Sequence, residues 1–240
     1  MSAPRFFVNA DIVPGEEQAL PEEVSHHIRH VLRLKENAPV VLFTGQGGEY
    51  TAVISSISKK AVTVRVDTFS PVNRQASLEI HLGLCVLKRD GMDRVIARTT
   101  ELGVSSITPV ISERCTVSHS IIRKRESHWQ QIAIAASEQC GLNIVPRINA
   151  AVALPEWLAS CETATRIVAL QTSDTIRAVS HDTGPITVLT GPEGGFSADE
   201  ISGFVPSGFQ PVAFGERILR AETAPIVALS VLHHRWGDFQ

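Results

Sequence analysis

The sequence predicts an α/β protein whose sheet is mostly parallel, preceded by a smaller β-rich domain. Residues 1–70 carry short alternating apolar segments that are typical of strands. From Ser77 onward, apolar strands alternate with amphipathic helices, which predicts a parallel sheet with helices on both faces. The segment Ser70–Ala76 between the two patterns is polar and contains a proline. We therefore expect two domains, over residues 1–72 and 73–240.

The first domain is expected to contain four strands and one helix. The strands follow in the order 5–8, 40–44, 50–57 and 61–69, and the helix spans 22–34. The segment Gly45-Gln46-Gly47-Gly48 separates the second and third strands, and its glycines favour a hairpin turn. The helix carries apolar residues at helical spacing, namely Val24, Ile28, Val31 and Leu32. This pattern predicts a small β-barrel-like domain.

The second domain is expected to alternate strands and helices along its whole length. Strands are predicted over 78–84, 104–110, 167–171, 186–190 and 212–214, and helices over 90–102, 122–140, 197–204 and 223–236. One helix opens with Ser197 and carries Glu200 three residues later, the pattern of a capping box. The last helix is apolar almost all round, so we expect it to be deeply buried.

Several classes of protein are disfavoured by composition. No apolar stretch approaches the roughly 18 residues that span a membrane, and the first residues lack the pattern of a signal peptide. The four cysteines are widely spaced without a C-x-x-C pair, and the nine histidines form no H-E-x-x-H pattern. We expect reduced thiols, no metal site and a cytoplasmic location.

The net charge of −3 is unevenly distributed. Residues 1–72 hold 7 basic and 8 acidic groups, residues 73–130 hold 9 and 6, and residues 131–240 hold 6 and 11. The middle of the chain is therefore basic although the whole is acidic. In addition, His26, Arg29, His30 and Arg33 share one face of the first predicted helix. This face is either a solvated surface or a ridge that binds phosphates.

Two loops of the second domain stand out as ligand-binding candidates. Residues 190–197 (TGPEGGFS) lie between a strand and a capped helix, and their glycines allow close approach to backbone amides. Residues 214–223 (FGERILRAET) also join a strand to a helix. In an open α/β sheet, ligands bind at the carboxyl ends of the strands, where both loops are expected. The common dinucleotide, P-loop and hydrolase motifs are missing from the sequence.

The combined pattern closely resembles the bacterial 16S rRNA (uracil-N3)-methyltransferase family of the knotted SPOUT superfamily. The resemblance rests, in order, on Leu84, Lys88, Met92-Asp93, Thr100-Glu101-Leu102-Gly103-Val104, Glu113-Arg114, Glu138-Gln139, Gly191-Pro192-Glu193-Gly194-Gly195, Gly215, Arg217-Ile218-Leu219-Arg220 and Glu222-Thr223-Ala224. The segments Arg5-Phe6-Phe7 and His27-Ile28…Val31-Leu32-Arg33 match the PUA-like domain of the same family. Residues 4–232 are covered. Leu142 stands where many members carry an arginine.

The resemblance implies both the fold and the activity. It implies a C-terminal SPOUT-type α/β domain with a trefoil knot and an N-terminal PUA-like β-barrel domain that binds RNA. It also implies a homodimeric cytoplasmic enzyme that uses S-adenosylmethionine to methylate N3 of one uridine in 16S rRNA, within the 30S subunit.

The same resemblance assigns candidate site residues. The cofactor site would comprise Leu170, Gln171, Leu189, Thr190, Gly191, Pro192, Glu193, Gly194, Gly195, Gly215, Arg217, Ile218, Leu219 and Glu222. Since N3 of uracil must lose a proton, a cation or a base is needed beside it. Arg220 and then Arg114 are candidate cations, and Glu138 or Glu222 is a candidate base or orienting group.

RNA contacts are expected from arginines and one lysine, because an unpaired or flipped base must be held by its backbone. The candidates are Arg5, Arg29, Arg33, Lys88, Arg94 and Arg98. Each has a structural alternative: Arg98 can pair with Glu101, and Arg94 with Asp90, on their common helix.

Three rival functions are weaker. A SPOUT enzyme acting on a ribose 2′-OH or a guanine shares many features, but the ELGV and RILRAET segments favour the uracil family. A non-catalytic RNA-binding or ribosome-assembly factor would be expected to have degenerate cofactor loops, and both loops are intact. A small-molecule α/β enzyme leaves the N-terminal β-domain with its basic face unexplained.

Overall fold

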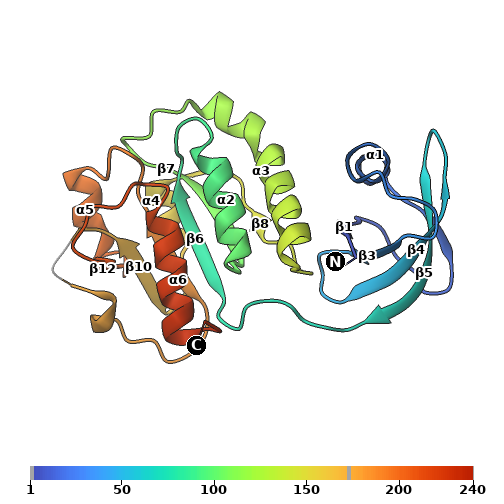
Figure 1. The fold of residues 1–240 in the computed structure, drawn as a ribbon. Coiled ribbons are helices and arrows are strands. Elements are labelled where there is room, and N and C mark those ends of the chain that lie inside the picture. Colours follow the sequence, from blue (N-terminus) through green and yellow to red (C-terminus); the bar gives the residue numbers. More distant parts are fainter. Residues whose placement is uncertain (1–2, 172–173, 240) are drawn as a thin grey trace. The chain divides into compact units, whose positions relative to one another are not determined.

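The computed structural model describes residues 3–171 and 174–239, which form two compact units (Figure 1). The first unit comprises Met1–Gln75 with Ser137–Val145, and the second comprises Ala76–Ala136 with Pro146–Gln240. One unit contains a mixed β-sheet and the other a parallel sheet with helices, which confirms the predicted fold class.

The first unit is built on a five-stranded sheet. The strand order is β1 (Arg5–Phe7), β3 (Pro39–Phe43), β4 (Glu49–Ile57), β5 (Val62–Ser70) and β2 (Glu17–Ala19). β1 runs parallel to β3, and the other pairs are antiparallel. Alternation places Val62, Val64 and Val66 in the buried core, as the sequence predicted. The short strand β2 was not predicted, because three residues are too few to show a period.

The turn between β3 and β4 requires its glycines. Gly45, Gly47 and Gly48 have φ angles of 80°, 92° and 71°, in the region that side chains disfavour. A Cβ on Gly48 would lie 2.3 Å from the ring of Phe69. The predicted hairpin is confirmed, and its geometry explains the glycine-rich sequence.

The predicted helix of the first unit is confirmed, but it widens along its length. α1 (Glu22–His26) continues into a π-helical segment, η1 (His27–Leu32), which ends at Arg33 with a φ angle of 53°. A π-helix has more residues per turn than an α-helix, so the spacing used to place a basic ridge does not hold throughout. Ser25 ties this helix to the sheet, because its buried hydroxyl donates to the Leu20 carbonyl and accepts the Val62 N–H.

The segment Ser137–Val145 belongs with the first unit, although the sequence placed it in the second domain. Its contacts are non-local. The Phe7 N–H donates to Glu138 Oε1 at 2.8 Å, and Asn143 donates to the Val72 carbonyl at 2.6 Å and accepts the Arg74 N–H. These contacts join residues that lie more than 60 positions apart in the sequence, so no local sequence pattern could predict them.

The second unit contains a seven-stranded parallel sheet. The main order is β12 (Gln210–Val212), β10 (Thr165–Ala169), β11 (Ile186–Thr190), β6 (Ile80–Cys85), β7 (Ser106–Ile111) and β8 (Arg147–Ile148), while β9 (Val152–Ala153) also pairs with β7. Every one of these pairs is parallel. The five predicted strands are present, and the two missed strands contain two residues each.

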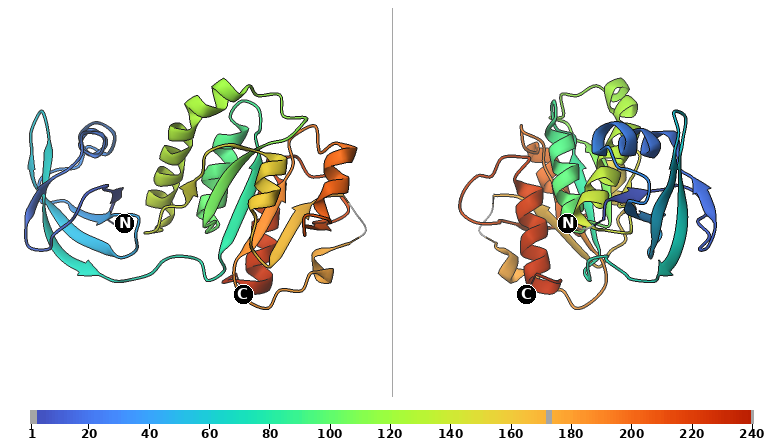
Figure 2. Two further views of the ribbon diagram at one scale, coloured as in Figure 1. Left: turned by 180° about the vertical axis from the view of Figure 1, so that it is seen from behind. Right: turned by 45° about the vertical axis from the view of Figure 1, so that its right-hand side comes forward.

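Helices cover both faces of this sheet (Figures 1 and 2). They are α2 (Gly91–Glu101), α3 (His119–Cys140), α4 (Leu154–Ser160), α5 (Ala198–Phe204) and α6 (Ala224–Trp236), with a 3₁₀ turn η2 over Ile176–Ala178. α4 and α5 pack Trp157 and Phe204 against Val168 and Leu189 of the sheet. Gly83 of β6 allows this approach, since a Cβ there would lie 2.3 Å from the Trp157 ring. α6 packs on β6, β11 and α2.

Two details of the predicted helices have different outcomes. The capping box is confirmed: the Glu200 N–H donates to Ser197 Oγ, and the Ser197 N–H donates to the Glu200 carboxylate. The deep burial expected for α6 holds for one face only, because the helix packs that face on the sheet and leaves Ile226, Val227 and Val231 half-buried. Within the described residues, no helix is long and apolar enough to cross a membrane.

Glu49 is the electrostatic centre of the first unit. Its carboxylate accepts hydrogen bonds from Arg5 at 2.7 Å and from Arg74 at 2.9 and 3.0 Å, and its side chain is 13% exposed. The bond from Arg74 lowers the pKa of Glu49 against the opposing effect of burial, and Arg5 lowers it further, to about 2. The ion pairs therefore tie β1 and the segment after β5 to β4.

Replacing Glu49 by Gln should lower the free energy of unfolding by about 2 kcal/mol at pH 7. The stabilisation is complete above the unfolded-state pKa near 4.5 and is lost as pH falls toward about 2, so wild type and variant should converge in acid. Denaturant unfolding at pH 7 and pH 3 measures this. Asp67→Asn, in the exposed pair with Arg65, is the control and should change stability by less than about 0.5 kcal/mol.

Candidate functional site

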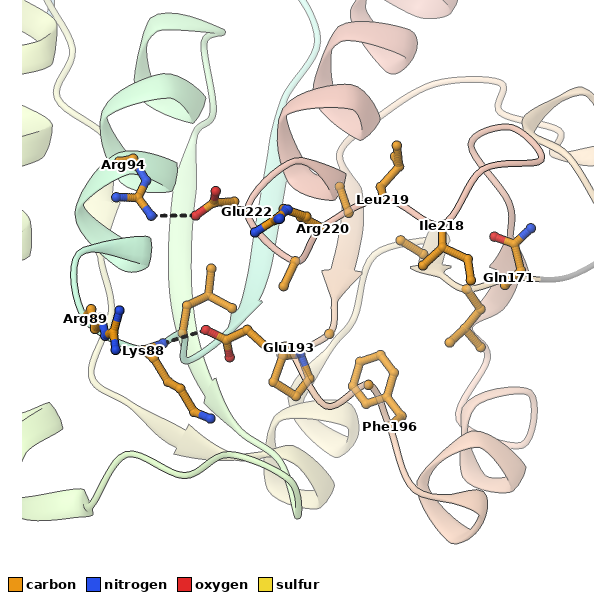
Figure 3. A pocket seen from close by; sticks show the side chains of 18 of the residues that line it. Lys88, Arg89, Arg94, Gln171, Glu193, Phe196, Ile218, Leu219, Arg220 and Glu222 are labelled. Carbon is orange, nitrogen blue, oxygen red and sulfur yellow. Dashed lines mark hydrogen bonds and ion pairs between the residues drawn. The ribbon is translucent and has the colours of Figure 1, made fainter.

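The second unit has a cavity of about 740 Å³ at the carboxyl ends of its central strands (Figure 3). Three loops and the end of β10 form its wall. The lining residues are Leu87, Lys88, Arg89, Asp90 and Arg94 near β6 and α2; Ala169, Leu170 and Gln171 after β10; Gly191, Pro192, Glu193, Gly195 and Phe196 after β11; and Ile218, Leu219, Arg220, Ala221, Glu222 and Ala224 before and within α6. This cavity therefore lies at the edge of the parallel sheet where the sequence predicted a ligand site.

The two sides of this cavity differ in chemistry. Figure 3 shows Gln171, Ile218 and Phe196 on one side, and Lys88 and Arg89 on the other. Ile218 is 89% exposed, which is unusual for a large aliphatic side chain on a cavity wall. The cavity thus suits a ligand with an apolar ring at one end and charge at the other.

The glycines of the loop after β11 are set by close packing. A Cβ on Gly191 would lie 2.9 Å from the Phe196 ring, and a Cβ on Gly194 would lie 3.3 Å from Arg114. Gly195 has a φ angle of 67°. Side chains at Gly191 and Gly194 would therefore collide with, or press on, Phe196 and Arg114, so the loop packs closely on these two residues.

Hydrogen bonds tie this loop to its neighbours. Glu193 Oε1 accepts the Lys88 N–H at 2.8 Å, and Arg114 donates to the Gly194 carbonyl at 3.0 Å. Glu200, at the start of α5, accepts the Glu113 N–H at 2.8 Å. The loops after β6, β7 and β11 are therefore joined through side-chain bonds to backbone groups.

The loop before α6 is held at both of its ends. The Glu222 carboxylate forms an ion pair with Arg94 at 2.6 Å, and Arg94 also pairs with Asp90. At the other end, Gln171 donates to the Glu216 carbonyl at 3.1 Å. Residues 217–221 lie between these anchors, with Ile218 and Arg220 in the cavity wall.

Most residues predicted for the cofactor line the cavity. They are Leu170, Gln171, Gly191, Pro192, Glu193, Gly195, Ile218, Leu219 and Glu222. The others lie nearby: Leu189 and Thr190 are buried in β11, Gly194 contacts Arg114, Arg217 lines a smaller cavity of about 130 Å³ that shares Leu170 and Ile218, and Gly215 has a φ angle of 107° in the same loop. Thr190 Oγ1 is fully buried and has no hydrogen-bond partner within the described chain.

The predicted catalytic residues are only partly brought together. Arg220 and Glu222 line the cavity. Arg114 does not line it and instead holds the Gly194 carbonyl. Glu138 lies in the first unit, where it accepts the Phe7 N–H; burial raises its pKa, and that hydrogen bond opposes the rise. The structure therefore supports neither Arg114 nor Glu138 as part of the cavity wall.

Two of the predicted RNA contacts have structural partners instead. Arg5 is paired with Glu49 at 13% side-chain exposure, donates to the Leu142 carbonyl and lies 5.2 Å from the Phe43 ring. Arg29 donates to the carbonyls of Ser25, Ser58 and Lys59. These bonds give both guanidinium groups a role within the fold, while Arg29 also lines a groove of the first unit, and their contact with RNA stays a prediction.

The other four candidates lie in three different places. Lys88 and Arg94 line the cavity of the second unit, where Arg94 has the predicted Asp90 pair. Arg98 forms the predicted alternative pair with Glu101 at 2.7 Å. Arg33 lines a groove of about 1040 Å³ on the first unit, formed by Arg29, His30, Arg33, Leu34, Lys35, Glu36, Ile57, Ser58 and Lys59.

Several functional candidates escaped sequence reasoning. Lys35 and Lys59 come together in the groove only because β4 and β5 return the chain beside η1. Phe196 directly follows Gly195 in the glycine loop, and this position in the sequence could have identified it as a cavity residue. Arg89 gave no signal, and its φ angle of 53° is visible only in the structure. Within residues 3–171 and 174–239, no cluster of metal-binding side chains is present.

Comparison with protein families yields two matches. A model described as RNA methyltransferase domain matches residues 74–233, and a model described as RNA methyltransferase PUA domain matches residues 20–67. Together these models cover both structural units.

Comparison with individual proteins agrees along the whole chain. A ribosomal RNA small subunit methyltransferase E from Buchnera aphidicola is 32% identical over 98% of this chain and 97% of its own length. A methyltransferase from Legionella pneumophila, solved with bound S-adenosylmethionine, is 35% identical with a TM-score of 0.96. A ribosomal RNA small subunit methyltransferase E from Neisseria gonorrhoeae, also bound to S-adenosylmethionine, is 33% identical with a TM-score of 0.94. Each alignment with a solved structure covers 100% of both chains.

The bond between Glu193 and the Lys88 amide should control the mobility of the loop after β6. We expect Glu193→Ala to accelerate hydrogen exchange at that amide by about tenfold, whereas Glu193→Gln keeps an acceptor and should stay near wild type. Exchange measured on the peptide spanning residues 86–91 tests this. Glu162→Ala, an exposed residue outside the cavity wall, is the control. Equal exchange in all variants would show that the bond does not order the loop.

Proposed function

This chain belongs to the RNA methyltransferase family that includes ribosomal RNA small subunit methyltransferase E, and we propose that it transfers a methyl group from S-adenosylmethionine to N3 of a specific uridine in 16S rRNA. Similarity along the full length, to relatives solved with this cofactor, carries the proposal. The cavity at the sheet edge, lined by the two loops that the sequence singled out, is where the reaction would take place.

The residues of the cavity fit S-adenosylmethionine. The cavity volume of about 740 Å³ lies in the range of small-molecule sites, and Gly191 and Gly195 line it without a side chain. The buried Thr190 hydroxyl at the end of β11 has hydrogen-bonding capacity unused by the described chain. Leu170, Ile218 and Leu219 would hold the adenine ring, and backbone groups of residues 191–195 would bond the polar part.

The bound cofactor supplies an electrophilic methyl group, and the protein supplies position and charge. Arg220 lies in the cavity wall, where its guanidinium would stabilise negative charge that develops on O2 or O4 as uracil loses the N3 proton. Glu222 is oriented by its ion pair with Arg94, so it would fix the loop that carries Arg220. Glu193 holds the loop after β6 through the Lys88 amide.

We assign RNA binding to the basic groove of the first unit. Arg33, Lys35 and Lys59 line it with His30, and one acid, Glu36, uses its carboxylate to accept the Ile57 N–H. Phosphate contacts of this kind position a substrate without reading its sequence. The target base itself must be unpaired or flipped, because N3 is hidden in paired RNA. In this proposal the PUA-like domain holds the RNA, and the SPOUT methyltransferase domain, expected over residues 73–240, carries the reaction.

The proposal includes a homodimer in the cytoplasm that acts on the assembled 30S subunit. The half-buried apolar face of α6, with Ile226, Val227 and Val231, supports a dimer because such faces favour a protein partner. Sedimentation velocity would test it, and a monomer at all concentrations would exclude it. The modest overall charge favours a folded particle over naked RNA as substrate. The trefoil knot stays a prediction.

Nucleoside mapping by mass spectrometry tests the function. The protein and S-adenosylmethionine are incubated with unmodified 16S rRNA, both free and assembled into 30S subunits, and the RNA is digested and analysed. We expect 3-methyluridine at one position. Its absence from both substrates would refute the proposal, and cofactor binding by calorimetry would then separate an RNA-binding factor from a methyltransferase with another target.

Arg220→Ala should lower kcat by about 100-fold or more while the Kd for S-adenosylmethionine changes less than about threefold. The reason is that the cation acts on charge that appears only in the transition state. Arg220→Lys keeps the charge and should recover part of the rate. Single-turnover methyl transfer and calorimetry measure the two quantities, and unchanged turnover would remove Arg220 from the reaction.

The double substitution Lys35→Ala, Lys59→Ala should raise the KM for RNA about tenfold and leave kcat near wild type, since the groove contacts phosphates away from the reacting base. Lys124→Ala, on the exposed surface of α3, is the matched control. A KM equal to that of the control would place the main RNA contacts elsewhere.

A further inference from the structure

Arg89 holds a backbone conformation that its residue type does not favour. It has a φ angle of 53°, and the other described non-glycine residues with positive φ are Arg33 and Asn37. Asparagine tolerates a positive φ because its short side chain can hydrogen-bond to the nearby backbone. The long arginine side chain provides no such local stabilisation. Unfavourable conformations of this kind concentrate at ligand-binding sites. The positive φ of Arg89 therefore indicates that its side chain has a role in ligand binding.

The residues on either side of Arg89 are fixed. The Lys88 N–H donates to Glu193, and the Asp90 carboxylate pairs with Arg94 on the first turn of α2. Arg89 lies between these anchors in the cavity wall and is exposed. Figure 3 shows it beside Lys88, on the side of the cavity opposite Gln171 and Ile218. The fold thus places this guanidinium at one defined position of the charged side.

The charges of the lining are unequally satisfied. Each acid has a donor: Asp90 and Glu222 pair with Arg94, and Glu193 accepts the Lys88 N–H. Of the basic groups, Arg94 is committed to those two acids. In the part of the chain that the structure describes, Lys88, Arg89 and Arg220 form no ion pair. Three exposed cations without an ion pair on one cavity favour the binding of an anion with several oxygens.

We propose that the charged side of this cavity is a subsite for the phosphodiester groups that flank the target uridine, and that Arg89 is a phosphate ligand within it. This inference rests on the proposed function. The uracil base is neutral when it arrives, so it cannot balance three cations, whereas the phosphates on its two sides bring two negative charges. A guanidinium can bind a phosphate through two parallel hydrogen bonds. Arg89 would then fix the nucleotide beside Arg220.

Arg89→Gly is the sharpest test, because glycine removes the side chain and is at ease with a positive φ. We expect an unchanged or higher melting temperature, an unchanged Kd for S-adenosylmethionine, and about tenfold weaker equilibrium binding of 30S subunits that carry unmodified 16S rRNA. The slope of log affinity against log salt concentration should fall by about 0.7, the value for one lost contact to a single strand. A merely structural role would not change that slope.

Two further variants at position 89 separate the loss of charge from an effect on folding. Arg89→Asn is uncharged and also tolerates positive φ, so it should reproduce the loss if the glycine variant folds poorly. Arg89→Lys keeps one charge and should recover most of the salt slope with part of the affinity. Arg123→Ala, an exposed arginine of α3 that does not line the cavity, is the control and should bind RNA as wild type does.

Other outcomes would overturn the proposal. If the glycine variant binds RNA as tightly as wild type, Arg89 is not a phosphate ligand. If it loses affinity for S-adenosylmethionine and keeps its affinity for RNA, Arg89 binds the carboxylate of the cofactor. The test is separate from that of the proposed function, because the latter fails only when the wild-type protein forms no 3-methyluridine.

Discussion

Parallel strands end at a common edge, and the candidate site depends on how this chain satisfies the backbone groups of the loops that meet there. Loops carry free amides and carbonyls that need partners when they pack together. Here side chains supply those partners from neighbouring loops. Glu193 accepts the Lys88 amide, Glu200 accepts the Glu113 amide, and Arg114 donates to the Gly194 carbonyl. These bonds join the connections after β6, β7 and β11 to one another.

The need to hold these loops together also explains which charged residues of the cavity are paired and which are not. The acids that line it are engaged in holding loops, which leaves basic groups as the free charges on that side. An enzyme that must hold one nucleotide of an RNA benefits from local cations at the reacting position more than from a strongly basic surface, because non-specific attraction slows release. The net charge of −3 is therefore compatible with an RNA substrate.

The two units contribute different physical properties. The first unit is stabilised around Glu49, whose two arginine partners come from segments far apart in the sequence. This removes Arg5 from the surface and leaves the groove beside η1 as the basic feature of that unit. In the second unit the central strand β11 is buried along its whole length, and the cavity is lined mainly by loops at the end of the sheet.

The sequence by itself determined the order of the longer strands and of most helices, the capping box at Ser197 and two of the loops that line the cavity, because apolar periodicity, caps and glycines are local signals. The tertiary structure alone decided which charged residues are free. In the sequence, Arg5 and Arg29 have the pattern of phosphate ligands. In the structure, Arg5 pairs with Glu49, Arg29 donates to the Lys59 carbonyl, and Glu138 accepts the Phe7 N–H of the first unit. The left-handed conformation of Arg89 and the position of Lys59 beside η1 likewise follow only from the tertiary structure. Ion pairs and groove walls join residues tens of positions apart, and no local pattern encodes that proximity.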